Sequence, residues 1–279
     1  MAVLIAAELA LRARYRSRVL PPSTATEPGK ITIVALGDSI TAGPVGAPDD
    51  AWPAILAARL RAGYRDVAWQ VVNAGVPGDT AALGYARFDQ DVAARGPQAV
   101  LIAFGLNDCN LARHAMDRWY ESRVPVGPEQ SYLWRAGQAR IERLSRSIDW
   151  PMIPAPEPEP QPSPRTTPSG FSAALTALVA RTREIGARPV LLTMTPLADE
   201  EMPGLQAFRA DYAAYNARVR ELARQRALPL VDLAAGAPDD AWEPDGLHLT
   251  AAGQRWVADR VYDRLNRAGI WEALAKRAR

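Results

Sequence analysis

A serine, a histidine and an aspartate of this chain have the side chains that a nucleophilic relay needs. A serine hydroxyl is a weak nucleophile, so Ser39 needs a base within hydrogen-bond distance. The chain has two histidines, and His248 is a candidate for that base because imidazole commonly takes this role. Asp245 lies three positions before His248 and could fix the imidazole tautomer from the same turn. Together these side chains predict acyl-transfer chemistry on Ser39.

Attack by Ser39 on a carbonyl would create an oxyanion, and three groups could donate hydrogen bonds to it. They are the amide N–H of Ser39, the amide N–H of Gly75 and the side-chain NH₂ of Asn107. Gly75 suits this task because a glycine lets the backbone approach a ligand closely. Each stretch also has an ordinary explanation: Ser39 as a helix cap, Gly75 and Asn107 as turn residues, and residues 245–248 as a polar turn. Their occurrence together, each after an apolar segment, favours catalysis.

Short apolar segments precede the candidate residues, and helical patterns alternate with them. The stretch Ile31–Gly43 indicates a buried strand that stops at Gly37. Further strands are expected at Trp69–Asn73, Ala99–Phe104, Pro189–Met194 and Leu228–Leu233, and helices at Ala51–Ala62, Thr80–Ala94, Ser172–Ile185, Leu205–Arg226 and Thr250–Leu265. The alternation predicts a parallel sheet with helices on both faces. Because parallel strands end at the same edge of the sheet, the candidate residues should meet there.

Four of these stretches together resemble the conserved blocks of the SGNH/GDSL hydrolase family, the GDSL-like lipases and esterases. The resemblance runs from about Lys30 to Leu265, and its blocks are Gly37-Asp38-Ser39-Ile40-Thr41, Asn73-Ala74-Gly75, Gly105-Leu106-Asn107-Asp108 and Asp245-Gly246-Leu247-His248. It implies a flavodoxin-like three-layer α/β/α sandwich with five parallel strands. It also implies esterase or acyl-hydrolase activity, with Ser39, Gly75, Asn107, Asp245 and His248 in the family's roles and no metal or organic cofactor.

Length and spacing predict three parts. Residues 1–29 form an apolar and basic segment with a linker, residues 30–270 form the hydrolase domain, and residues 271–279 form a tail. A long insertion at about 109–168 interrupts the domain, with a helical pattern at Ser131–Asp149 and a Pro-rich end. It is either a partial lid over the site or a surface decoration. Since this region shapes substrate selection in the family, the insertion leaves the substrate open.

Composition excludes several classes of function. A net charge of +2 on 33 basic and 31 acidic residues gives no basis for nucleic-acid binding. Two histidines and one cysteine argue against an imidazole-rich metal site and against an internal disulfide. Residues 1–18 are a membrane-adjacent helix, the remnant of a membrane anchor, a helix docked on the domain or a frayed terminus. They lack the order of a cleavable signal peptide. A cytoplasmic or a membrane-associated location both fit.

The sequence therefore predicts a serine ester hydrolase that forms an acyl-enzyme on a small-molecule, lipid or sugar ester. Alternatives are an acyltransferase that uses the same acyl-enzyme and a non-catalytic binding protein of the same fold. An acyl-carrier module does not fit, because that class is small, acidic and helical whereas this chain is long and slightly basic. A nucleotide-binding protein has little support, because the sequence contains no phosphate-binding loop motif. Among the other polar residues, Asp232 competes with Asp245 as the orienting acid, and Asp38 and Asp108 are expected to brace turns. Oligomeric state is not indicated.

Overall fold

The computed structural model describes residues 29–44, 46–111, 124, 163–198 and 205–279. The predicted N-terminal segment, most of the predicted insertion and the helical pattern at Ser131–Asp149 lie outside the described residues. The membrane-adjacent helix and the lid over the site therefore stay predictions. Within the described part of the chain, no helix has both the length and the apolar character needed to cross a bilayer.

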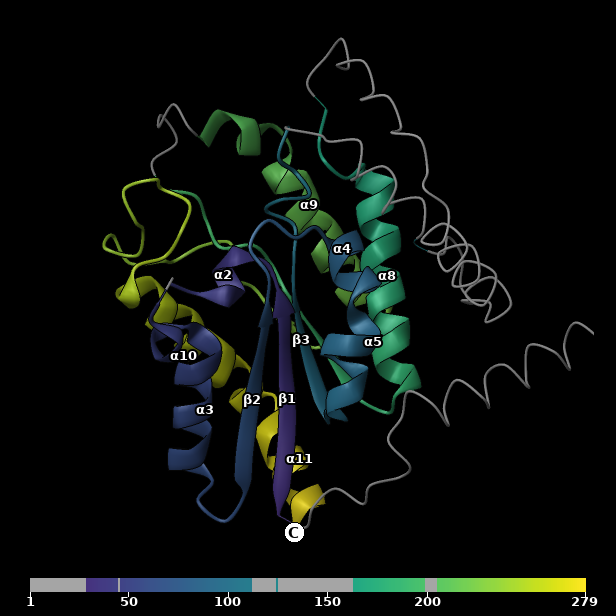
Figure 1. Ribbon diagram of the computed structural model, residues 1–279, viewed down its shortest axis with the longest axis vertical. Helices are drawn as coiled ribbons and strands as arrows, with labels where there is room; N and C mark the ends of the chain where they lie inside the picture. Colours follow the sequence, from purple (N-terminus) through teal and green to yellow (C-terminus); the bar gives the residue numbers. More distant parts are fainter. Residues whose placement is uncertain (1–28, 45, 112–123, 125–162, 199–204) are drawn as a thin grey trace, which may run out of the picture.

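Five parallel strands form the centre of the molecule, which confirms the predicted α/β class (Figure 1). They are β1 (Lys30–Gly37), β2 (Ala68–Gly75), β3 (Ala99–Ala103), β4 (Arg188–Leu192) and β5 (Leu230–Val231). Their spatial order is β2-β1-β3-β4-β5, the order of flavodoxin-like sheets. The order changes direction at β1, between β2 and β3, so the carboxyl end of β1 is the expected place for a ligand.

The central strand β1 is apolar on both faces because each face of the sheet supports a separate core. Along β1, Ile31 and Ile33 belong to the cluster on one face, whereas Val34 and Leu36 belong to the cluster on the other. All four side chains are fully buried. This is the alternation that a strand imposes on successive side chains, and it explains why the sequence of β1 shows an unbroken apolar run.

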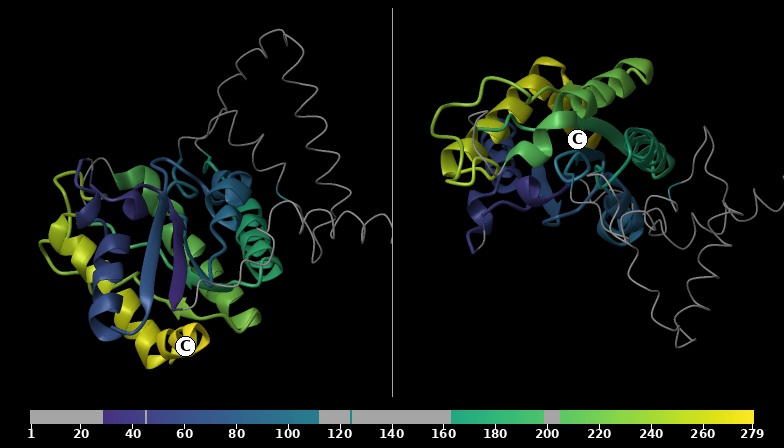
Figure 2. Two further views of the ribbon diagram at one scale, coloured as in Figure 1. Left: turned by 60° about the horizontal axis from the view of Figure 1, so that its bottom comes forward. Right: turned by 90° about the horizontal axis from the view of Figure 1, so that it is seen from above.

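Helices cover both faces of the sheet and complete three layers (Figures 1 and 2). One face packs against α3 (Trp52–Gly63), α10 (Ala251–Arg267) and α11 (Ile270–Ala278). The other packs against α4 (Ala81–Ala86), α5 (Phe88–Asp91), α8 (Pro168–Glu184) and α9 (Gln206–Gln225). The short helix α2 (Ser39–Ala42) follows directly on β1. In Figure 2 the yellow C-terminal helices and the teal α8 lie on opposite sides of the strands.

Two predicted segments differ from the structure. The single helix expected at Thr80–Ala94 is instead α4, α5 and a 3₁₀ turn at Ala93–Arg95, and Arg87 lies between α4 and α5. Residues 271–279, expected to be a tail, form most of α11, where Trp271 is fully buried and its indole N–H donates to the Tyr262 carbonyl at 3.0 Å. An aromatic side chain that completes the core makes this segment part of the domain.

Candidate active site

Ser39 lies at the carboxyl end of β1, at the start of α2. The Asp38 side chain caps that helix by accepting the Ile40 amide at 3.0 Å. Gly37 leaves no room for a side chain, because a Cβ there would lie 2.2 Å from the Thr41 Oγ1 and 2.7 Å from the Ala103 carbonyl. The tight turn that follows from this close packing presents the Ser39 hydroxyl at the strand end.

Asp245 and His248 occupy one turn that Asp245 itself organises. Its Oδ1 accepts the amides of Leu247 and His248 at 2.9 Å each. Its Oδ2 lies 2.6 Å from the Nδ1 of His248. One carboxylate therefore fixes both the backbone of the turn and the orientation of the imidazole.

The turn is attached to the segment that follows β4. The Trp242 indole N–H donates to the Pro196 carbonyl at 3.1 Å, and the Ala198 amide donates to the Gly246 carbonyl at 2.9 Å. These two contacts hold the His248 turn over the carboxyl edge of the sheet.

The structure brings Ser39, His248 and Asp245 into one hydrogen-bonded line. The Nε2 of His248 lies 3.0 Å from the Oγ of Ser39, although 209 positions separate the two residues. The three candidate residues thus have the distances that acyl transfer by a serine requires. This arrangement can remove a proton from the hydroxyl and hold the resulting imidazolium beside a carboxylate.

The electrostatics of the turn support an ionised Asp245. Partial burial alone would raise its pKa, but hydrogen bonds from the His248 side chain and from the Leu247 and His248 amides outweigh burial and hold the pKa of Asp245 below its usual value. A charged carboxylate at this position stabilises a protonated imidazole.

The three predicted oxyanion donors lie on three neighbouring segments. Ser39 begins α2, and Gly75 ends the adjacent strand β2, where a Cβ would lie 2.2 Å from the Ala42 amide nitrogen. The Gly75 amide donates to the Oδ1 of Asn73 at 3.0 Å. Asn107 follows β3, and its side-chain NH₂ donates to the Asp79 carbonyl at 3.2 Å. The side-chain NH₂ of Asn107 has two protons, so one of them stays available for a ligand.

Asp38 and Asp108 are buried beneath these donors. Burial raises the pKa of Asp38 to about 7, although the hydrogen bond from the Ile40 amide acts in the opposite direction. Burial likewise raises the pKa of Asp108 to about 7, against hydrogen bonds from Thr166 and Ala81. Both carboxyls accept backbone amides, Asp108 that of Ala81 at 3.1 Å. They brace turns, as expected from the sequence.

Asp232, which competes with Asp245 as the orienting acid, and Cys109, the one cysteine of the sequence, occupy other environments. Asp232 accepts both the Nε of Arg220 at 2.7 Å and the Oγ1 of Thr193 at 3.0 Å. Cys109 is fully buried, and this burial raises its thiol pKa, so it is not a nucleophile. His114 lies outside the described residues.

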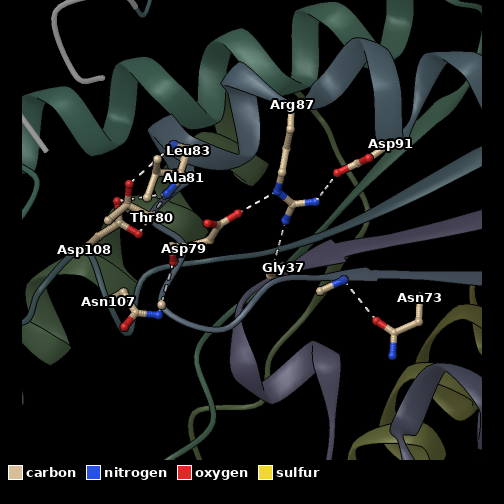
Figure 3. A network of polar contacts seen from close by, with 12 residues as sticks. Gly37, Asn73, Asp79, Thr80, Ala81, Leu83, Arg87, Asp91, Asn107 and Asp108 are labelled. Carbon is tan, nitrogen blue, oxygen red and sulfur yellow. Dashed lines mark hydrogen bonds and ion pairs between the residues drawn. The ribbon is translucent and has the colours of Figure 1, made fainter. Parts of the chain in front are cut away.

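Two site residues were not identified from the sequence as functional. Asn73 donates to the Ala42 carbonyl at 3.1 Å while it accepts the Gly75 amide, and so it joins β2 to α2. Arg87, between α4 and α5, reaches Asp79, Asp91 and the Gly37 carbonyl (Figure 3). Its spacing of four from Asp91 predicts a helical ion pair, but no sequence signal indicates the contact with β1.

Among the residues that the structure describes, no group of three or more His, Cys, Asp or Glu side chains is arranged to hold a metal ion.

Sequence and structure comparisons relate the chain to known proteins. A family model described as the GDSL-like Lipase/Acylhydrolase family matches residues 35–256. A protein named arylesterase from Vibrio mimicus is 37% identical over 76 residues, which is 27% of this chain and 37% of that protein. The match therefore spans little more than a third of the relative.

Solved structures share the fold at lower identity. The lipase/acylhydrolase from Enterococcus faecalis superposes with a TM-score of 0.57 and 22% identity, covering 85% of this chain and 96% of that one. An acetylxylan esterase from Geobacillus stearothermophilus gives a TM-score of 0.56 and 21% identity, covering 86% and 96%. At these identities the likeness establishes the fold.

Proposed function

The chain belongs to the GDSL-like lipase/acylhydrolase family, and from that premise we propose that it hydrolyses a carboxylic ester through an acyl-enzyme on Ser39. The observation that carries the proposal is the 3.0 Å contact between the Ser39 hydroxyl and the His248 imidazole. Asp245 on the far side of the same ring, 2.6 Å from Nδ1, completes the arrangement.

The first half of the reaction forms the acyl-enzyme. Nε2 of His248 takes the hydroxyl proton as the Oγ of Ser39 attacks the ester carbonyl. The carbonyl oxygen becomes an oxyanion, and the carbon becomes tetrahedral. The intermediate collapses, its bond to the alcohol oxygen breaks, and the proton now on His248 moves to that oxygen. The alcohol leaves, and the acyl group stays on Ser39.

The second half releases the acid. His248 takes a proton from a water molecule, and the hydroxide attacks the acyl carbon to form a second tetrahedral intermediate. Collapse of that intermediate breaks the bond to Oγ and returns the proton from His248 to Ser39. The carboxylic acid leaves, and the enzyme is restored.

Oxyanion stabilisation in both halves is assigned to the Ser39 amide, the Gly75 amide and the Asn107 side chain. Gly75 donates to Asn73 in the absence of substrate. To stabilise an oxyanion, the Gly75 amide therefore either donates to the oxyanion and to Asn73 at once or gives up its hydrogen bond to Asn73. The negative oxyanion is the stronger acceptor, since hydrogen bonds to charged groups exceed those to neutral amides.

For the substrate we propose an ester with a short acyl group and either an aryl or a sugar alcohol. This choice rests on relatives named arylesterase and acetylxylan esterase. A lysophospholipid, a thioester and a short lipid ester are the competing classes. An acyltransferase would carry out the first half unchanged and replace water with an acceptor alcohol in the second.

The test is an ester panel run with wild type, Ser39→Ala and His248→Ala. The panel holds p-nitrophenyl esters from acetate to decanoate, an acetylated xylooligosaccharide and a lysophospholipid. Each variant should reduce kcat by about three or more orders of magnitude while the circular dichroism spectrum is retained. Ser172→Ala is the matched control, because that hydroxyl donates to the Pro168 carbonyl on α8. Wild-type rates in Ser39→Ala would refute the mechanism, and a transfer product with added alcohol would identify an acyltransferase.

A further inference from the structure

The guanidinium of Arg87 contacts three acceptors from three segments of the chain (Figure 3). Its Nε donates to the Oδ2 of Asp79 at 2.6 Å, its Nη1 to the Oδ2 of Asp91 at 2.8 Å, and its Nη2 to the Gly37 carbonyl at 3.0 Å. The Arg87 side chain is 17% exposed and that of Asp79 is 10% exposed. We call these four residues the Arg87 network. It is largely shielded from water, where such hydrogen bonds are strongest.

The Gly37 contact reaches the segments that carry Ser39 and Gly75. Gly37 ends β1, two positions before Ser39. Its carbonyl also accepts the Val76 amide at 3.0 Å, and Val76 directly follows Gly75. One carbonyl oxygen thus joins Arg87, the strand that presents the nucleophile and the loop that presents the second amide donor.

The Asp79 contact reaches the third donor. The main-chain carbonyl of Asp79 accepts the side-chain NH₂ of Asn107 at 3.2 Å. The carboxylate of the same residue is held by Arg87 at 2.6 Å. The position of Asp79 therefore sets where Asn107 points, and Arg87 sets the position of Asp79.

We infer that Arg87 is a positioning residue for the reaction: through Asp79 and Gly37 it fixes the three oxyanion donors relative to one another. This inference rests on the proposed function, because it concerns the same site. Arg87 acts through other residues and touches no reacting atom. Its contribution appears when the oxyanion forms, so it lowers the barrier and leaves the binding of the ester unchanged.

The competing explanation is that Arg87 only forms a structural ion pair next to α4 and α5. A variant of Asp91 distinguishes this explanation from a positioning role. Asp91 accepts only from the Nη1 of Arg87, whereas the contacts with Asp79 and Gly37 use Nε and Nη2. Asp91→Asn therefore keeps both contacts that lead to the site, and it is the matched control. A structural role predicts that Asp91→Asn and the Arg87 variants change stability alike and leave kcat per folded molecule unaltered.

The experiment measures kcat, KM and Tm for Arg87→Met, Arg87→Lys and Asp91→Asn on the ester that wild type cleaves best. Arg87→Met should lower kcat roughly 10–100-fold with KM within about twofold, since small displacements of catalytic groups cost that much. Arg87→Lys keeps the charge but loses the planar fork, and it should restore kcat only in part. Asp91→Asn should stay within about twofold of wild-type kcat. If Arg87→Met does not fold, Arg87→Lys decides alone, and unchanged kcat in a folded Arg87→Lys overturns the inference.

A double-mutant cycle with Asn107→Ala tests the route of the effect. If Arg87 acts through the donors, the Arg87→Lys substitution should cost much less in the Asn107→Ala background than in wild type. Full additivity of the two effects overturns the inference. Ser39→Ala distinguishes failure of the proposed function from failure of the inference about Arg87. An active Ser39→Ala refutes the proposed function, whereas an inactive Ser39→Ala with an unaffected Arg87→Lys refutes only the inference.

Discussion

The candidate site has two sides that are held in different ways. The nucleophile side, residues 37–42, 73–80 and 105–108, is fixed by buried groups: Asp38 is 3% exposed, and Thr41, Thr80 and Asp108 are fully buried. The base side, residues 241–250, carries catalytic candidates that face water, since the side chains of His248 and Asp245 are 44% and 50% exposed.

The contacts that hold the candidate residues on the two sides also differ in how far apart their partners lie in the sequence. On the nucleophile side, partners are far apart in the chain: Asp108 binds the Ala81 amide across 27 positions and Arg87 binds Gly37 across 50. On the base side, Asp245 organises residues two and three positions later. Half-exposed ion pairs contribute only about 0–1 kcal/mol to stability. Changes on the base side should therefore cost rate and little stability, whereas changes on the nucleophile side should cost both.

The largest expected effect on kcat is that of Asp245→Asn, on the base side. The amide keeps the size of the side chain but loses the charge beside the imidazolium, and kcat should fall roughly 10³–10⁴-fold, as for the orienting acid of other serine hydrolases. Thermal unfolding should place the Tm within a few degrees of wild type, since the pair is half exposed. A large loss of Tm would contradict the local character of the base side.

Asp232→Asn is the control for that variant. Asp232 also follows β5, but Arg220 and Thr193 bind it. Its substitution should leave kcat within about twofold. If Asp232→Asn were the inactive variant and Asp245→Asn the active one, the assignment of the orienting acid would be reversed.

Asn107→Ala is the next largest change, on the nucleophile side. Loss of one oxyanion donor should lower kcat roughly 10²–10³-fold with little change in KM. Tm should also fall, because the Asp79 carbonyl loses its hydrogen bond from Asn107. Kinetics and thermal unfolding on the same preparation check both. A raised KM at constant kcat would assign Asn107 to substrate binding instead.

The same division explains what could be predicted from the sequence. The five strands follow from short apolar runs, because both faces of a parallel sheet are buried. The contact between Asp245 and His248 is local, so their spacing of three is sufficient to predict it. The family blocks located Ser39, Gly75 and Asn107 at strand ends, and the structure places all three at the same edge of the sheet.

What could not be predicted depends on contacts between distant segments. The break between α4 and α5 falls at Arg87, whose partner on β1 is 50 positions away. Helical periodicity in residues 80–94 carries no information about that partner. The core position of Trp271 likewise depends on Trp69, whose ring centroid lies 6.1 Å away across the chain. The contact of the Gly75 amide with Asn73 arises from a turn geometry that several residue types allow.

The smallest effect concerns stability alone and tests the burial of the nucleophile side. The pKa of Asp38 is raised from 3.8 to about 7, chiefly by burial. Between about pH 4 and pH 7 the folded protein therefore keeps a proton on Asp38 that the unfolded chain has lost. In that interval folding binds a proton, so the free energy of unfolding falls as the pH rises and levels off above pH 7. Asp108 has the same shift and adds a second contribution of the same sign.

Asp38→Asn removes one of these two titrations and keeps an oxygen that can accept the Ile40 amide. Urea unfolding between pH 4 and pH 8 should therefore show a shallower decline for Asp38→Asn than for wild type, and a still shallower one when Asp108→Asn is added. Asp245 makes the opposite contribution in all three proteins, because its pKa is lowered and its stabilisation is lost only at more acid pH. Parallel pH profiles for wild type and Asp38→Asn would mean that Asp38 is ionised in the folded protein, and the contrast between a buried nucleophile side and a solvated base side would no longer hold for its charges.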